Sequence, residues 1–261
     1  MGDSSTVNEP SSESVPRLLK AVVFDMDDTL FLEHEYVLSG FRHIAGLVAE
    51  SARSSPDEIF AFLNASAEKS ENRGRILDTL VEEYPSLGRA WSVNRLIEEY
   101  RCHIPRIGLF RGAASMLSEL RRAGAHLAVI TDGASQSQHR KAEALELARR
   151  VDLLIVTDDQ GIECRKPNPY AYRKVSETFG CGPDACVYVG DNPAKDFLAP
   201  RELGWKTIRI RFPKQLHAKV EPLDPQAAPS IECGSIAQLR SLLMAWLSEA
   251  MNSNGARSQN R

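Results

Sequence analysis

The sequence predicts an α/β fold, in which a parallel sheet lies between two layers of helices and a small all-helical domain is attached. Three observations support this. Five short apolar runs bounded by polar residues are typical of buried strands, amphipathic stretches separate most of these runs, and one long segment has helical patterns alone. Strands that alternate with helices form parallel sheets covered on both faces. Right-handed crossovers make such a sheet a doubly wound, Rossmann-like three-layer sandwich.

The predicted strands and core helices follow one another along the chain. The strands are 18–24 (LLKAVVF), 126–131 (HLAVIT), 153–157 (LLIVT), 186–189 (CVYV) and 207–210 (TIRI). Helical spacing predicts core helices over 113–123, 137–148, 170–179 and 194–203, and a packing helix over 236–247. Gly124, Gly180 and Gly204 follow three of these helices, at the position where glycine ends many helices.

The segment after the first strand contains no strand-like run. Its helical patterns cover 36–52, 56–69, 73–84 and 93–102. A helix bundle cannot lie inside a parallel sheet, so we expect residues 32–108 to form a separate cap domain. This cap would interrupt a core domain made of 18–31 and 109–251. Because open α/β sheets bind ligands at the carboxyl ends of their strands, the cap is a candidate lid.

Composition and charge exclude several classes of protein. The chain has 261 residues, with 32 basic and 35 acidic residues and a net charge of −3, which argues against a nucleic-acid-binding protein. No apolar run approaches the roughly 20 residues that cross a bilayer. The first residues lack an apolar signal core, so we expect a cytoplasmic protein. The polar termini, 1–17 and 252–261, are predicted to be disordered. The five irregularly spaced cysteines indicate free thiols.

Acidic residues gather at the end of the first predicted strand. This strand runs into Asp25, Asp27 and Asp28, followed by Thr29. Three carboxylates this close together are unfavourable unless a cation or a proton compensates their charge. Asp25 and Asp27 are two residues apart, so in extended geometry their side chains leave the same face. A solvated acidic turn is the alternative interpretation.

A second acidic group follows the fourth strand. Asp191 lies at the strand end, Asn192 is predicted to cap a helix that begins at Pro193, and Asp196 would lie in its first or second turn. The ends of two parallel strands converge at one edge of a sheet. Carboxylates placed there form an oxygen-ligand site suited to Mg²⁺.

The remaining two strand ends carry anion-binding groups. Thr131, Asp132 and Gly133 follow the second strand and offer a hydroxyl group and backbone N–H groups to an anion. Lys166 follows the third strand, and Pro167 keeps it out of a helix. Taken alone, these are an ordinary turn and a solvated lysine. Near carboxylates and a phosphate, the lysine would be a fixed counterion.

These strand ends resemble, in order, the four motifs of the haloacid dehalogenase-like superfamily. The motifs are Asp25-x-Asp27-x-Thr29, then Thr131, then Lys166 before Pro167, then Gly190-Asp191 with Asp196. The helical insert resembles the C1-type cap of that superfamily. The sequence departs from the family pattern at two positions. Asp132 stands where Asn is common, so we expect its backbone N–H to face the phosphate. Asp28 stands where a small residue is common, and we expect it to be exposed and without a catalytic role.

The resemblance implies a catalytic role for three residues. Asp25 would attack phosphorus and form an aspartyl-phosphate. Asp27 would protonate the leaving oxygen and then take a proton from the attacking water. Lys166 would balance the charge of the nucleophile and of the transition state.

The resemblance also implies a metal site and a phosphate site. Mg²⁺ would be bound by the carboxylates of Asp25 and Asp191 and by the backbone carbonyl of Asp27. Asp196 would reach the metal through water or orient Lys166, and the sequence leaves both open. The phosphate would be held by Thr131, by the backbone N–H groups of Asp132 and Gly133, and by Lys166.

Within this superfamily, Asp27 favours phosphoryl transfer, since dehalogenation produces no leaving alkoxide to protonate. We therefore predict a Mg²⁺-dependent phosphatase. A cap over the site favours a small phosphate monoester, such as a sugar phosphate or a nucleoside monophosphate, with no nucleic-acid or membrane partner. Three alternatives remain. They are a phosphomutase, a phosphonate hydrolase with Lys69 as its Schiff-base lysine, and a binding or regulatory protein that has lost catalysis.

The sequence offers several candidate contacts to the leaving group. The candidates in the cap are His34, Glu35, Tyr36, Arg42, His43, Asn72 and Arg75. Each is an ordinary surface or core residue in the alternative interpretation. The segment 209–229 is long for a loop and has no role that the sequence assigns.

Overall fold

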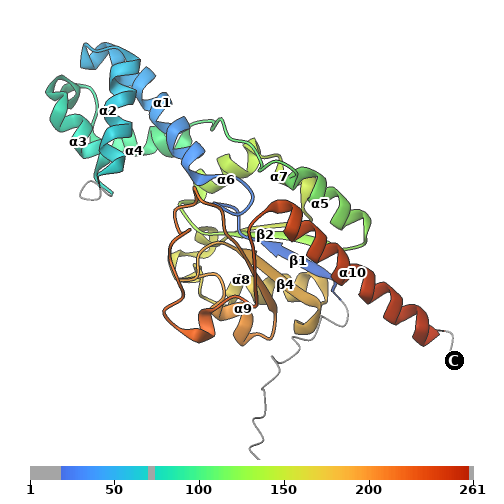
Figure 1. The fold of residues 1–261 in the computed structure, drawn as a ribbon. Helices are drawn as coiled ribbons and strands as arrows, with labels where there is room; N and C mark the ends of the chain where they lie inside the picture. Colours follow the sequence, from blue (N-terminus) through green and yellow to red (C-terminus); the bar gives the residue numbers. More distant parts are fainter. Residues whose placement is uncertain (1–18, 70–73, 259–261) are drawn as a thin grey trace, which may run out of the picture.

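The computed structural model describes residues 19–69 and 74–258, with side chains described as far as Glu249. Its centre is a six-stranded sheet in which all neighbouring strands are parallel, in the order β3-β2-β1-β4-β5-β6. Figure 1 labels three adjacent strands of the sheet, β2, β1 and β4. The strands are β1 (Ala21–Phe24), β2 (His126–Thr131), β3 (Leu153–Val156), β4 (Cys186–Gly190), β5 (Lys206–Ile210) and β6 (Ile231–Cys233). The predicted fold class is confirmed. The sequence analysis missed β6, which has only three residues.

Helices cover both faces of the sheet because successive residues of each strand point to opposite sides. In β1, Val22 and Phe24 pack into one buried cluster, and Ala21 and Val23 into another. The first cluster is covered by α5 (Ala113–Arg122), α7 (Leu147–Arg150) and α10 (Ile236–Ser258), together with the end of α6 (Ser135–Ala144). The second is covered by α8 (Tyr170–Phe179) and α9 (Leu198–Glu202). The result is a three-layer core.

Three predicted boundaries in the core differ from the structure. The helix expected over 137–148 is two helices, α6 and α7, separated at Glu146, whose backbone is left-handed (φ 52°). The helix expected over 194–203 is only α9, because residues before Leu198 form turns. Helix α10 continues to Ser258, into the segment 252–261 that we expected to be disordered. The other expected tail, 1–17, lies outside the described residues.

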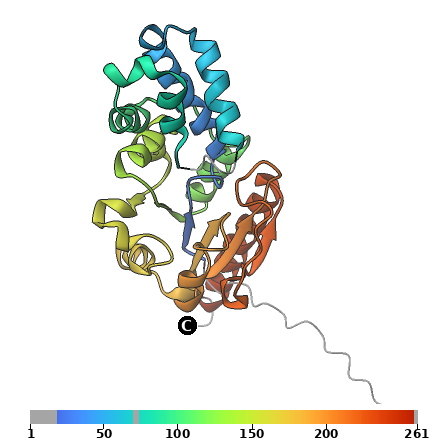
Figure 2. The same ribbon diagram turned by 90° about the vertical axis from the view of Figure 1, so that its left-hand side faces the viewer.

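The cap is a group of helices with a buried cluster of its own. It contains α1 (Glu33–Ala52), α2 (Pro56–Glu68), α3 (Ile76–Glu83), the 3-10 turn η2 (Pro85–Arg89) and α4 (Val93–Cys102). Ile44, Val48, Leu63 and Leu96 are among the residues buried between these helices. The chain leaves the core for the cap after β1 and comes back to the core close to the same point. There the Phe110 N–H donates to the carbonyl oxygen of Leu30 (2.8 Å). In both views the cap lies at one end of the molecule, beyond β1 (Figures 1 and 2).

Short elements and loops complete the core. The 3-10 turns are η3 (Thr157–Gln160), η4 (Ile162–Cys164), η5 (Pro183–Ala185) and η6 (Pro225–Ala227). The segment between β5 and β6, residues 211–230, is the β5–β6 loop. All five cysteines are free, as predicted. Within the described ranges, no helix has both the length and the apolar character needed to span a bilayer.

Candidate active site

The parallel sheet brings the four predicted groups of residues to one edge. Asp25 directly follows β1, which lies between β2 and β4. Thr131 ends β2, Asp191 follows β4, and Lys166 comes from the loop after β3. The Asp25 N–H donates to the carbonyl oxygen of Val189 (2.8 Å), which fixes the first residue beyond β1 against β4.

Lys166 lies at the centre of this cluster. Its ammonium group is fully buried and donates to Asp25 Oδ1 (2.6 Å), to Asp196 Oδ1 (2.8 Å) and to the hydroxyl of Tyr188 (2.9 Å). A buried charge is tolerated only when it is paired and hydrogen-bonded, and these three acceptors satisfy all three N–H groups. The lysine is therefore held in one position between two carboxylates.

Asp196 contacts Lys166 from a loop rather than from a helix. Its Oδ2 accepts hydrogen bonds from the N–H groups of Asp191 (3.2 Å) and Asn192 (2.9 Å), which fold the chain back on itself before α9. The side chain of Asn192 accepts the N–H of Ala194 (3.0 Å) within this turn. Our prediction that Asn192 caps a helix containing Asp196 is therefore wrong. Asp196 contacts Lys166, as one of its two predicted roles requires, and it also lies beside Asp25 and Asp191, the two carboxylates predicted to bind the metal.

The acidic cluster fits a divalent cation. Asp25, Asp191 and Asp196 each offer an oxygen atom within 4.8 Å of the others, and all three are buried. Asp191 Oδ2 is buried without a hydrogen-bond partner. Burial, with repulsion from Asp196 and Asp25, raises the pKa of Asp191 to about 9. Burial also raises the pKa of Asp25 to about 6, against the opposing charge of Lys166. A cation at Asp191 would relieve this electrostatic penalty, and the all-oxygen donor set is of the type that Mg²⁺ prefers.

Asp27 is held by the helix that follows β2. Lys141 Nζ donates to Asp27 Oδ1 (2.6 Å) and Gln138 Nε2 donates to Asp27 Oδ2 (2.7 Å). Both donors lie on α6 and are buried. The sequence analysis missed them. Their spacing of three residues, on a helix that begins just after Thr131, Asp132 and Gly133, was the available signal.

The residues predicted to bind phosphate form a compact turn. Thr131 is buried, and its Oγ1 accepts a hydrogen bond from Gln138 Nε2 (2.8 Å). The Asp132 carboxylate accepts from Thr157 Oγ1 (2.9 Å), from the Lys166 N–H (3.1 Å) and from Lys195 Nζ (3.3 Å). These protein partners occupy its oxygens, and the contact of its backbone N–H with a phosphate stays a prediction. Lys195 is a further cation that the sequence analysis missed.

Our prediction that Asp28 is exposed is wrong. Its side chain is buried, and it accepts the backbone N–H of Glu33 at Oδ1 (2.8 Å) and that of Leu216 at Oδ2 (2.7 Å). The backbone of Asp28 is left-handed (φ 53°), a conformation that aspartate tolerates better than most residues. Asp28 thus joins the first helix of the cap and the β5–β6 loop to the strand end that carries Asp25.

The β5–β6 loop is anchored to the same edge by other contacts. Gln215 donates to the backbone carbonyl of Asp28, and the side chains of His217 and Asn192 lie 3.1 Å apart. The buried guanidinium of Arg209 donates to Asp191 O (3.0 Å), and also to the carbonyls of His217 and Val220 (2.8 and 2.7 Å). The loop therefore supports two of the strand ends that carry the acidic residues.

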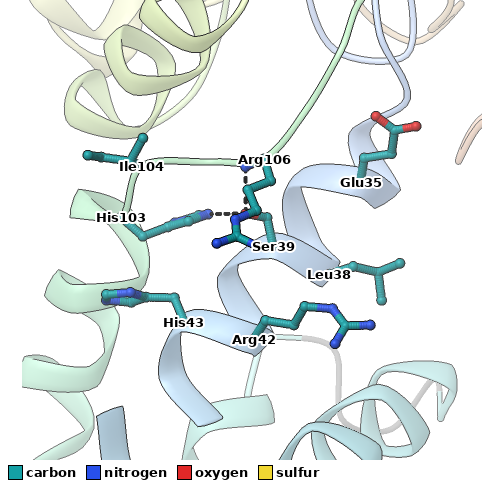
Figure 3. A pocket seen from close by; sticks show the side chains of 8 residues that line it. All are labelled: Glu35, Leu38, Ser39, Arg42, His43, His103, Ile104 and Arg106. Carbon is teal, nitrogen blue, oxygen red and sulfur yellow. Dashed lines mark hydrogen bonds between the residues drawn. The ribbon is translucent and has the colours of Figure 1, made fainter. Parts of the chain in front are cut away.

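The cap has a cavity of about 570 Å³ between α1 and the segment that leads back to the core (Figure 3). Its lining residues are Glu35, Leu38, Ser39, Arg42, His43, His103, Ile104 and Arg106. Three predicted leaving-group contacts, Glu35, Arg42 and His43, thus line one cavity. Tyr36 faces Lys141 instead, with the ammonium 4.3 Å from its ring centroid. His34 and Arg75 do not line this cavity, and Asn72 lies outside the described residues.

Solved structures share the fold. A HAD phosphatase from Thermococcus onnurineus superimposes with a TM-score of 0.55 at 20% identity, covering 86% of this chain and 98% of that one. A 2-haloacid dehalogenase from Pseudomonas syringae pv. Tomato superimposes with a TM-score of 0.58 at 21% identity, covering 88% and 100%. At this identity the likeness concerns the fold alone.

Sequence relatives and a family model give the closer comparison. The chain is 29% identical to a phosphoserine phosphatase of Thermus thermophilus over 167 residues, 64% of this chain and 63% of that protein, which is less than two thirds of its length. It is 26% identical to a glyceraldehyde 3-phosphate phosphatase of Methanopyrus kandleri over 220 residues, 82% of this chain and 93% of that protein. The model of the haloacid dehalogenase-like hydrolases matches residues 19–204, more than half of the chain. The resemblance read from the motifs is thereby confirmed, and the chain belongs to the haloacid dehalogenase-like hydrolase family.

Proposed function

We propose that this hydrolase is a Mg²⁺-dependent phosphatase that cleaves small phosphate monoesters through an aspartyl-phosphate on Asp25. One observation carries the proposal. Asp25 projects from the end of β1 with one oxygen 2.6 Å from the buried Lys166, and Asp27 follows it two residues later in a separate hydrogen-bonded position. A nucleophile and a proton carrier at this spacing suit phosphoryl transfer.

The residues of the chain would act in two steps. Thr131 and the N–H groups of the turn at Asp132 and Gly133 would hold the phosphate oxygens. The Asp25 carboxylate would attack phosphorus while Asp27 gives its proton to the departing oxygen. Water would then attack the phosphorus atom of the aspartyl-phosphate, and the Asp27 carboxylate would take up the proton that the water loses. The bond between phosphorus and the Asp25 oxygen would break, which releases inorganic phosphate. At the end of each turnover Asp25 is again a free carboxylate and Asp27 again carries a proton.

Charge balance supports the assignment of Asp25 as the nucleophile. Burial raises the pKa of Asp25 to about 6, and the opposing charge of Lys166 favours the ionised carboxylate that a nucleophile requires. Lys166 holds one of its oxygens, which fixes the side chain and offsets charge at the reacting centre. Mg²⁺ held by Asp25 and Asp191 would supply the positive charge that lets a carboxylate approach a phosphate.

The cap and the relatives support a small substrate. Phosphoserine, glyceraldehyde 3-phosphate and pyrophosphate are named in the relatives' descriptions, and all are small. We propose a substrate of sugar phosphate or nucleoside monophosphate size for this chain. Arg42 and His43, which line the cavity of the cap, are the side chains that we propose contact a polar leaving group.

Release of inorganic phosphate from a panel of phosphate monoesters, with and without Mg²⁺, tests the proposal. We expect Mg²⁺-dependent turnover by the wild type and none by Asp25→Asn, with an unchanged circular dichroism spectrum. Asp184→Asn, an exposed carboxylate before β4, is the matched control and should retain full activity. Activity that survives Asp25→Asn would refute the nucleophile. No turnover of any ester would favour a binding protein that has lost catalysis, and phosphate movement between substrate hydroxyls without release would indicate a phosphomutase.

A further inference from the structure

The carboxylate of Asp27 is clamped from both sides by one helix. Lys141 Nζ lies 2.6 Å from Oδ1 and Gln138 Nε2 lies 2.7 Å from Oδ2, so each oxygen has its own donor. The carboxyl group cannot rotate without breaking one of these bonds. Both donors are buried, which keeps water from replacing them.

Gln138 ties this clamp to the phosphate-binding turn. Its Nε2 also lies 2.8 Å from Thr131 Oγ1 and 2.5 Å from the carbonyl oxygen of Asp132. The position of Asp27 is therefore fixed relative to the turn that would hold the phosphate. A proton carrier has to be held in a defined position relative to the leaving oxygen, and this network would provide it through the contacts of Gln138 with the turn.

The cap covers the other half of the clamp. The Lys141 ammonium lies 4.3 Å from the ring centroid of Tyr36 and 3.9 Å from Glu33 Oε1, and both residues belong to α1. The side chain of Lys141 is only 5% exposed as a result. Tyr36 in turn packs edge-on against Tyr100 of α4, with ring centroids 5.5 Å apart. Lys141 thus lies where the cap, α6 and Asp27 meet.

We propose that Lys141 is a positioning residue that sets the Asp27 carboxyl group for proton transfer, and that Tyr36 of the cap completes this setting by covering Lys141. The proposal rests on the proposed phosphatase function. Lys141 acts through Asp27 and does not touch the reacting atoms. Displacement of a catalytic group by about 1 Å can lower a rate by about 10²-fold, so loss of the clamp should affect proton transfer strongly.

The test compares two esters that differ in their need for an acid. The leaving group of an alkyl phosphate is an alkoxide, which requires a proton. The leaving group of p-nitrophenyl phosphate is a phenolate, which is stable without one. We expect Lys141→Met to lower kcat/KM for the alkyl ester by about 10²-fold and for the aryl ester by less than about tenfold. Lys141→Arg keeps the charge but moves the donor atoms. It should also lower kcat/KM more for the alkyl ester than for the aryl ester, but by smaller factors than Lys141→Met. For Tyr36→Ala, the loss of kcat/KM for the alkyl ester should be smaller than the loss for Lys141→Met.

Matched controls separate positioning from general damage. Arg140→Met removes a neighbouring cation on the same helix, whose only ion pair among the described residues is with the exposed Glu143. This variant should leave kcat/KM for both esters unchanged. Equal losses for the two esters, or no loss, would refute the proposal. If Lys141→Met does not fold, the same comparison with Lys141→Arg decides. Absence of any turnover by the wild type would refute the phosphatase function instead, which keeps the two failures distinct.

Discussion

Replacing Lys166 with methionine removes the one ammonium group that bridges Asp25 and Asp196. Methionine fills nearly the same space, so the effect is electrostatic rather than a loss of packing. Both carboxylates are buried, at 3% and 0% side-chain exposure, so water cannot solvate them in place of the lysine. The Tyr188 hydroxyl still donates to Asp196 (3.2 Å), which offsets a small part of the loss.

The size of the effect follows from the burial. Breaking a buried ion pair by removing one partner costs about 3–5 kcal/mol, because the remaining charge is left uncompensated. Against a total stability of about 5–15 kcal/mol, Lys166→Met should be folded but clearly weakened without metal. A cation bound at 100 times its Kd stabilises the native state by about 2.7 kcal/mol. We expect Mg²⁺ to stabilise the variant more than the wild type, because it replaces a missing positive charge.

Urea unfolding, monitored by tryptophan fluorescence, measures the free energy of unfolding of Lys166→Met and of the wild type, once in EDTA and once in excess Mg²⁺. Trp205 packs against Tyr172 in the same layer as the site and reports on the core. Lys174→Met, on the exposed side of α8, is the control and should stay within about 0.5 kcal/mol of the wild type. A loss below about 1 kcal/mol in EDTA would refute the argument from burial. Equal losses with and without Mg²⁺ would show that the cation does not bind at this cluster.

Three further predictions concern the acidic residues. Without metal, stability should fall as pH rises, by at most about 1.4 kcal/mol per pH unit for one proton. The reason is that the native pKa of Asp191, about 9, exceeds its unfolded value. The stability that the protonated carboxyl contributes is therefore complete below about pH 4 and is lost as the pH rises through about 9. Urea unfolding in EDTA at a series of pH values measures this loss, and a free energy of unfolding that does not change with pH would contradict it. Asp191→Asn should flatten that profile and weaken Mg²⁺ binding at least tenfold by calorimetry, whereas unchanged affinity would exclude Asp191 as a ligand. Asp28→Ala should destabilise the protein by about 2–4 kcal/mol in urea, because two backbone N–H groups lose their acceptor, and Asp28→Asn should lose less.

The sequence predicts the strands and the residues at their ends because both are local features. An apolar run between polar residues indicates a buried strand wherever it occurs, and the strand ends of a parallel sheet share one edge by geometry. The proximity of Lys166, Asp25 and Asp191 could therefore be predicted from the sequence alone.

The partners that the sequence analysis missed lie far along the chain or in irregular segments. Asp28 binds Leu216, which is 188 positions away, and Asp27 binds Lys141, which is 114 positions away. No periodicity encodes such contacts, since they depend on how the β5–β6 loop and helix α6 pack against the end of β1. The start of α9 was misjudged because residues 193–197 form turns, in which the side chain of Asp196 accepts the backbone N–H groups of Asp191 and Asn192.

The hydrogen bond between Phe110 and Leu30 has a consequence for how the chain is assembled during synthesis. The cap is contiguous in sequence and has its own buried cluster, as expected of a unit that folds before the rest of the chain is made. Strand β1 emerges earlier, yet its neighbours in the sheet, β2 and β4, follow only after the cap. A folded cap, with its two ends side by side, shortens the distance that β1 has to search to meet β2. The inserted domain would thereby act as an internal scaffold for the sheet that carries it.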